Sequence, residues 1–264
     1  MDAGMGPGMA EDDFMPSFHH GEVEIAYLDE GAGEPIVLVH GFASNKEVNW
    51  VNPGWVSTLT RAGRRAIALD NRGHGRSTKS YDPADYHTSL MADDVRALLD
   101  YLGLDHADIM GYSMGARITA FTAMQHPDRV RSAVFAGLGI KLVHGVGLPE
   151  TVAEGLLAPS LDDVTDSQSR MFRSFAQQTK SDLRALAACI SGTRQTLTEE
   201  QVAAIKVPVL VAVGTEDEVA GPPEPLAALI PGAKVLRIPG RDHMLAVGDR
   251  VYKSGVLEFL NQRP

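Results

Sequence analysis

Hydrophobic positions recur along the chain with two different periods, and the period predicts the type of element. Short continuous apolar runs are typical of strands that are buried on both faces of a sheet. Such runs occupy residues 35–40, 65–70, 107–110, 130–136, 207–213 and 234–238. Polar and apolar residues alternate over 22–28, which predicts a strand with one exposed face.

Helical patterns lie between these runs. Residues 90–102 carry apolar side chains at close to helical spacing, and residues 114–125 are apolar nearly all round and stop before Pro127. Residues 251–260 are expected to close the chain as a terminal helix. Buried strands separated by helices predict an α/β fold with one parallel sheet covered on both faces.

One long segment interrupts this alternation. No buried strand pattern appears from 139 to 201, where Met171, Phe172 and Phe175 instead follow helical spacing. We therefore expect a helical lid subdomain at 139–201, inserted into a core formed by 18–138 and 202–264. The alternative is that this segment supplies ordinary packing helices.

The first seventeen residues are rich in Met, Gly and acidic residues. They lack the basic start and the apolar stretch of a signal peptide. We expect residues 1–17 to form a disordered lead-in, with Met15 as an alternative start of the protein.

Composition narrows the class of protein. Against 24 Lys and Arg stand 34 Asp and Glu, a net charge of −10, and such a surface is poorly suited to bind nucleic acid. No apolar run is long enough to span a membrane. The single cysteine, Cys189, forms no internal disulfide and no zinc site, which favours a reducing, cytoplasmic location. We expect no nucleic-acid, membrane or metal partner; the oligomeric state is open.

The most specific motif is Gly-x-Ser-x-Gly around Ser113, between an apolar strand and an apolar helix. A sharp strand-to-helix turn requires small residues on both sides of the serine, because the two backbones nearly touch there. Such a turn exposes the hydroxyl of Ser113 beside a helix N-terminus, where negative charge is stabilised. This context favours a catalytic nucleophile over a serine that merely caps a helix.

A serine nucleophile requires a base, and the base requires an orienting acid. His243 follows the strand at 234–238 and is the expected base, whereas His40 is expected to be architectural. Asp217 follows the strand at 207–213 and is the expected acid. Its neighbours Glu216 and Glu218 are expected to be solvated, although either remains an alternative.

Acyl transfer also requires donors for the oxyanion. The residue after the serine, Met114, is expected to supply one backbone N–H, and Phe42, in the loop after His40-Gly41, is expected to supply the second.

These residues together resemble the α/β-hydrolase family. The matching segments are 40–42, 70–77 and 111–115, followed by Asp217 and His243, and the resemblance extends from about residue 18 to the end of the chain. It implies a mostly parallel eight-stranded sheet flanked by helices, with a small helical lid and no metal or organic cofactor. Ser113 stands where dehalogenases and epoxide hydrolases of this fold have Asp, which favours the carboxylesterase and enol-lactonase branches.

The expected function is hydrolysis of a small or medium carboxylic ester, thioester or lactone through an acyl-enzyme on Ser113. A carbon–carbon bond hydrolase, an enzyme similar to the hydroxynitrile lyases and a non-catalytic small-molecule receptor remain alternatives. Residues of the lid and of the loop beside the base are expected to line the pocket: Leu142, Val143, Leu148, Met171, Phe172, Phe175 and Met244. Arg117 is expected to form a buried ion pair, with a substrate carboxylate as the alternative partner.

Overall fold

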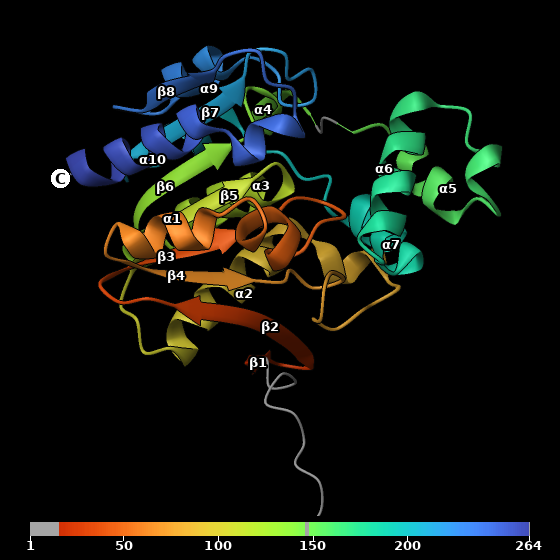
Figure 1. Ribbon diagram of the computed structural model, residues 1–264, viewed down its shortest axis with the longest axis horizontal. Helices are drawn as coiled ribbons and strands as arrows, with labels where there is room; N and C mark the ends of the chain where they lie inside the picture. The colour runs from red at the N-terminus through yellow and green to blue at the C-terminus, as the bar shows by residue number, and fades with distance from the viewer. Residues whose placement is uncertain (1–15, 146–147, 264) are drawn as a thin grey trace, which may run out of the picture.

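A computed structural model describes residues 16–145 and 148–263, and its strands form one eight-stranded sheet in the order β1-β2-β4-β3-β5-β6-β7-β8 (Figure 1). The strands are β1 (Ser17–His20), β2 (Val23–Glu30), β3 (Glu34–Val39), β4 (Arg64–Leu69), β5 (Ala107–Tyr112), β6 (Val130–Ala136), β7 (Val209–Gly214) and β8 (Lys234–Ile238). β2 runs antiparallel to β1 and β4, and every other neighbouring pair is parallel. The carboxyl ends of β3 to β8 therefore meet at one edge of the sheet.

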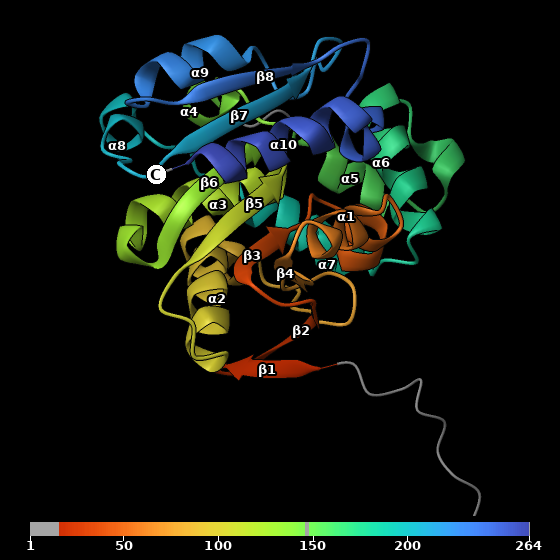
Figure 2. The ribbon, with the colours of Figure 1, turned by 60° about the vertical axis from the view of Figure 1, so that its left-hand side comes forward.

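Helices cover both faces of the sheet. The longer ones are α1 (Trp55–Arg61), α2 (Thr88–Tyr101), α3 (Met114–Gln125), α9 (Pro223–Leu229) and α10 (Arg250–Gln262). α1 and α10 lie together on one face, with α2 and α3 on the other (Figure 2). Single turns lie at η2 (Glu47–Val51), η3 (Pro83–Tyr86), η4 (Pro127–Arg129) and η6 (Leu245–Gly248).

The buried side chains alternate between the two faces along each central strand. Val37 and Val39 of β3 pack into the cluster beneath α2 and α3, whereas Ile36 and Leu38 pack into the cluster beneath α1 and α10. All four side chains are fully buried. Burial on both faces explains why the central strands appear in the sequence as continuous apolar runs.

A helical insertion separates β6 from β7. It contains α4 (Lys141–His144), α5 (Thr151–Leu157), η5 (Leu161–Asp163), α6 (Ser167–Gln178) and α7 (Leu183–Gly192), and α8 (Glu199–Ala203) follows it. In Figure 1, α5, α6 and α7 lie beyond the carboxyl ends of β3 and β4, which the arrowheads of these two strands mark. Residues of α5, α6 and α7 join the same apolar cluster as α2 and α3, so the insertion is packed onto the core.

The predicted fold class is confirmed, and the differences lie at the two edges of the sheet. β1 has no counterpart in the predicted strands, because its four residues are too few to show a period. It begins at Ser17, inside the expected lead-in, whereas residues 1–15, including Met15, lie outside the described residues. β8 was expected to be buried on both faces, but it is an edge strand with Val235 38% exposed. Within 16–145 and 148–263, no helix has both the length and the apolar character needed to cross a bilayer.

The packing of α10 contains one unpaired polar group. Tyr252 is fully buried against Trp55, with ring centroids 4.6 Å apart, and its hydroxyl has no hydrogen-bond partner among the described residues. A buried hydroxyl without a partner costs about 1–3 kcal/mol.

We predict that Tyr252→Phe leaves the free energy of unfolding unchanged or raises it by about 1 kcal/mol, because the substitution removes the unpaired oxygen. Tyr86→Phe is the matched control, since the fully buried Tyr86 donates its hydroxyl to the Ser80 carbonyl at 2.6 Å. In this control variant, the free energy of unfolding should fall by about 1–3 kcal/mol. Urea denaturation followed by circular dichroism measures both, and a loss in Tyr252→Phe equal to that in Tyr86→Phe would contradict the prediction.

Candidate active site

Ser113 lies on the sharp turn from β5 into α3, with φ 55° and ψ −112°. Such backbone angles are strained for a residue with a side chain and cost about 1–3 kcal/mol. The turn is possible because α3 approaches the sheet closely. A Cβ on Gly115 would lie 2.0 Å from the Val39 carbonyl oxygen, and one on Gly111 would lie 2.1 Å from the Gly115 carbonyl oxygen.

His243 connects Ser113 to Asp217 through two hydrogen bonds. Its Nε2 lies 2.9 Å from Ser113 Oγ, and its Nδ1 lies 2.8 Å from Asp217 Oδ2. An ionised carboxylate only accepts hydrogen bonds, so Nδ1 carries the proton and Nε2 is available to accept one from the serine. All three groups come from loops or turns at the carboxyl edge of the sheet.

The Asp217 carboxylate is held in place by its own loop. Its Oδ1 accepts hydrogen bonds from the backbone N–H groups of Val219 and Ala220, both at 2.9 Å, which leaves Oδ2 for His243. Asp217 is buried, whereas Glu216 and Glu218 are exposed to solvent. Of the three neighbouring carboxylates, the structure brings Asp217 to the histidine.

Tyr112, which was not singled out in the sequence, fixes the loop that carries His243. Its buried hydroxyl donates to the His243 carbonyl oxygen at 2.6 Å. Burial and the nearby Asp217 raise the pKa of Tyr112 well above its usual value, so the hydroxyl keeps the proton that it donates. No local pattern in the sequence indicates this contact, because it joins residues that are far apart in the chain.

The loop of residues 40–46, here called the oxyanion loop, presents the N–H of Phe42. This N–H has no acceptor among the described residues, and that of Met114, at the first position of α3, has none within the helix. Phe42 and Met114 therefore offer two unpaired donors near Ser113. The next residue, Ala43, has φ 60°, and it is held on both sides by His74 Nε2, which accepts from its N–H, and by Thr179, which donates to its carbonyl.

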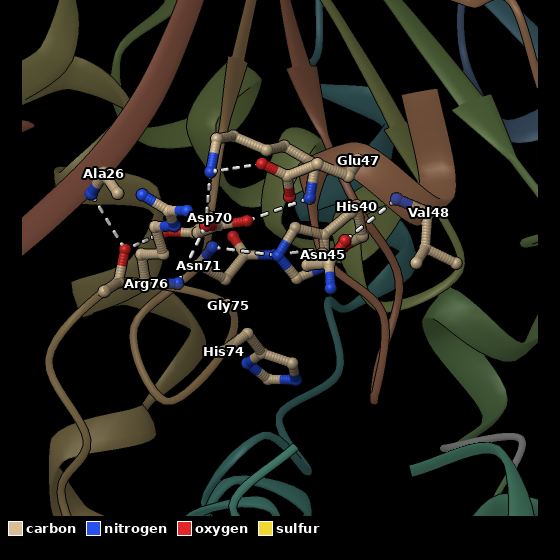
Figure 3. Close-up of polar contacts among 12 residues, drawn as sticks. Ala26, His40, Asn45, Glu47, Val48, Asp70, Asn71, His74, Gly75 and Arg76 are labelled. Carbon is tan, nitrogen blue, oxygen red and sulfur yellow. Dashed lines mark hydrogen bonds and ion pairs between the residues drawn. The ribbon is translucent and has the colours of Figure 1, made fainter. Parts of the chain in front are cut away.

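Asp70, at the end of β4, anchors the far end of the oxyanion loop. Lys46 donates its backbone N–H to Asp70 Oδ1 at 2.8 Å and its ammonium to Oδ2 at 2.7 Å, and both side chains are fully buried. The N–H of Arg76 also donates to Oδ2, so Asp70 lies at the centre of the contacts in Figure 3. Burial alone would raise the pKa of Asp70, but the Lys46 ammonium and the Arg76 N–H outweigh it and hold that pKa below its usual range.

Two buried histidines hold this loop as neutral acceptors. His40 Nε2 accepts from the Asn71 N–H at 3.0 Å, and His74 Nε2 accepts from the Ala43 N–H at 3.2 Å. Burial lowers the pKa of His40, and it lowers that of His74 to about 3. A protonated ring would have no lone pair for these N–H groups, so the neutral form is the one that the loop requires.

Two cavities meet at Ser113, and Phe42 also lines both. The larger, of about 290 Å³, is apolar and extends past His243 between α6 and the loop 244–248. The smaller, of about 40 Å³, extends over Met114 toward Leu138, Leu148 and Ile190.

Some of the predicted pocket residues line one of these two cavities, and the others line neither. Phe172, Phe175 and Met244 line the larger cavity and Leu148 lines the smaller. Met171, Leu142 and Val143 line neither. Met171 is 39% exposed, because it lies next to Phe172 on α6 and consecutive helical residues point about 100° apart. Leu142 is fully buried and Val143 partly buried, both packed in the core cluster.

Sequence reasoning missed much of the wall opposite α6. Val48, Asn49 and Pro53 follow the oxyanion loop, and Leu245 and Val247 follow the histidine. Their place in the chain directly after two functional segments is the only signal that pointed to them. Trp55 supports this wall from behind, since its indole N–H donates to the Val247 carbonyl at 2.7 Å.

Arg117 differs from the expectation of a buried ion pair. No carboxylate lies within salt-bridge distance of it among the described residues; its guanidinium donates instead to the carbonyl oxygens of Lys141, Leu142, Gly145 and Gln195. Burial lowers the pKa of Arg117 to about 10, a value that still leaves the guanidinium charged at neutral pH. Backbone carbonyls, which no sequence pattern identifies, take the place of the missing anion.

We predict that Lys46→Met destabilises the protein by about 3–5 kcal/mol, because it leaves the buried Asp70 charge without its counter-ion. Lys206→Met is the control, since Lys206 is exposed, and it should change the free energy of unfolding by less than about 0.5 kcal/mol. Urea denaturation at neutral pH measures both variants. A loss below about 1 kcal/mol in Lys46→Met would show that the ion pair is not what holds the loop.

We predict that the stability of the protein falls in acid because of the low pKa of the buried His74 ring. The unfolded chain takes up a proton near the ordinary pKa of 6.5, whereas the folded protein resists it down to about 3, so stability falls as the pH falls through this window. The contribution is about 1.4 kcal/mol per pH unit below the unfolded pKa. His74→Gln removes this titration and keeps an acceptor, so its unfolding free energy should fall less steeply between pH 6 and 4. The exposed His106→Gln is the control and should retain the wild-type slope.

Comparison with known proteins gives related matches along most of the chain. A family model described as alpha/beta hydrolase fold matches residues 34–159. A non-heme chloroperoxidase from Kitasatospora aureofaciens is 28% identical over 91% of this chain and 97% of its own. A 2-(acetamidomethylene)succinate hydrolase from Mesorhizobium japonicum is 28% identical over 91% and 93%.

Solved structures share the fold. The enol-lactonase from Burkholderia xenovorans superposes with a TM-score of 0.78 at 22% identity, covering 94% of this chain and all of that one. The family match, the eight-stranded sheet and the arrangement at its carboxyl edge agree. The chain has the α/β-hydrolase fold, and the family model of that description matches it over residues 34–159.

Proposed function

We propose that the protein is a serine hydrolase that cleaves a small or medium carboxylic ester, thioester or lactone through an acyl-enzyme on Ser113. The observation that carries this proposal is the continuous hydrogen-bonded path from Ser113 Oγ through His243 to Asp217. A serine held in this way is activated for attack, because the base accepts its proton as the new bond forms.

The reaction proceeds in two halves. Ser113 Oγ attacks the acyl carbonyl carbon while His243 Nε2 takes the hydroxyl proton, and the N–H groups of Phe42 and Met114 stabilise the oxyanion. The carbon–oxygen or carbon–sulfur bond to the leaving group then breaks, and His243 protonates that group. Water, deprotonated by His243, attacks the acyl-enzyme and releases the acid, which returns Ser113 and His243 to their starting states.

The helical insertion acts as a lid in this proposal. Phe172 and Phe175 lie three residues apart on α6 and line the larger cavity together, so they form its roof. Phe42 packs against Phe172 with ring centroids 5.8 Å apart, which brings the insertion into contact with the oxyanion loop. An enclosed apolar site strengthens the electrostatic stabilisation of the oxyanion.

The finer choice of bond rests on the site and on the relatives. The fold of the B. xenovorans enol-lactonase supports lactones within the substrate range, and the similarity to a 2-(acetamidomethylene)succinate hydrolase supports hydrolysis more generally. The buried free thiol of Cys189 fits a cytoplasmic enzyme.

We predict that Ser113→Ala lowers kcat on p-nitrophenyl acetate by at least about 10³-fold, and that Asp217→Asn lowers it by about 10⁴-fold because the histidine loses its orienting partner. Glu218→Gln is the control, since this exposed neighbour should leave kcat within about twofold. Initial rates with circular dichroism of each variant measure these effects. Undiminished turnover in a folded Ser113→Ala variant would overturn the serine mechanism.

A further inference from the structure

The two cavities at Ser113 differ in size and in their relation to His243. His243 lines the larger cavity, of about 290 Å³, together with Met244 and Leu245. Of the residues described, those that line the smaller cavity of about 40 Å³ include Met114, Leu138 and Ile190 but not His243. This asymmetry distinguishes the two halves of an ester.

The general acid determines which half lies where. His243 Nε2 must reach the leaving-group oxygen to protonate it, so the leaving group lies on the side of the serine that His243 lines. The acyl group bonded to Ser113 Oγ then lies on the other side. It therefore occupies the smaller cavity, next to the Met114 N–H.

The size of the smaller cavity limits the acyl group. A volume of about 40 Å³ has room for about three water-sized groups. Leu138, Leu148 and Ile190 close it, and each of these side chains is less than a tenth exposed. Arg117 also borders it, but its guanidinium already donates to four backbone carbonyl oxygens.

The lining of the larger cavity describes the alcohol. Its walls are apolar side chains from α6, η2 and the loop after His243, with Ser44 and Asn49 as hydrogen-bonding groups. Among the described residues, no Asp, Glu, Lys or Arg lines it. A charged leaving group would lose its hydration there without gaining a partner.

We infer that the substrate is an ester of a short acyl group, acetyl or propionyl, with a larger uncharged alcohol. The inference rests on the proposed function and adds the orientation of the substrate to it. An ester with the opposite distribution of bulk would place its large acyl group against Leu138 and Ile190.

Benzyl acetate and methyl phenylacetate test the orientation directly, because they are isomers that differ in which half carries the ring. The wild-type enzyme should hydrolyse benzyl acetate with at least about tenfold higher kcat/KM, measured by acid release in a pH-stat. Equal or faster hydrolysis of methyl phenylacetate would overturn the inference and leave the serine mechanism intact. Hydrolysis of neither ester, nor of p-nitrophenyl acetate, would overturn the proposed function as well.

Two variants test the assignment of each cavity. Ile190→Ala enlarges the smaller cavity and should raise the ratio of kcat/KM for benzyl butanoate to that for benzyl acetate by about tenfold. Phe175→Ala enlarges the larger cavity and should leave this ratio unchanged. A change of the ratio in Phe175→Ala but not in Ile190→Ala would place the acyl group in the larger cavity. Preference for benzyl hydrogen succinate over benzyl propionate would overturn the inference that the acyl group is uncharged. Arg117 would then be the partner of the succinyl carboxylate.

Discussion

The close approach of α3 to the sheet is the constraint on which the rest of the site depends. Gly111 and Gly115 allow the backbones to touch, and the turn between them raises Ser113 into a strained conformation at the carboxyl edge. The hydroxyl of Ser113 and the first N–H of α3 take their positions from this contact. The strain is local, and the buried packing of α3 against β5 and β6 offsets it.

The oxyanion loop depends on a second constraint, which is electrostatic. Asp70 receives the backbone and the ammonium of Lys46 in the interior, and neutral His74 receives the N–H of Ala43. These contacts give the loop one conformation although Ala43 lies at a positive φ. In the proposed reaction, the donor at Phe42 is thereby held in place before any substrate arrives, which is the condition for effective stabilisation of developing charge.

The parts of this structure that follow from local patterns could be predicted from the sequence, and those that follow from distant contacts could not. Continuous apolar runs located the central strands, because burial on both faces leaves no polar positions. The residue types around Ser113 pointed to its turn for a similar local reason. Other contacts join segments that are far apart in the chain, such as the buried pair of Lys46 and Asp70 and the hydrogen bond from Tyr112 to the His243 carbonyl. No local pattern in the sequence indicates them. On α6 the period did not say which of Met171 and Phe172 faces inward, since that depends on the rotation of the helix against its neighbours.

Arg117 holds the two ends of the helical insertion to α3, the helix that follows Ser113, through carbonyls of residues 141–145 on one side and of Gln195 on the other. These hydrogen bonds are made to main-chain oxygen atoms, so they do not depend on which side chains the bonded residues carry. Mutations within the insertion can therefore accumulate during evolution without loosening its attachment. The side chains of α6 that line the larger cavity can therefore change while the attachment of the insertion to α3 is retained.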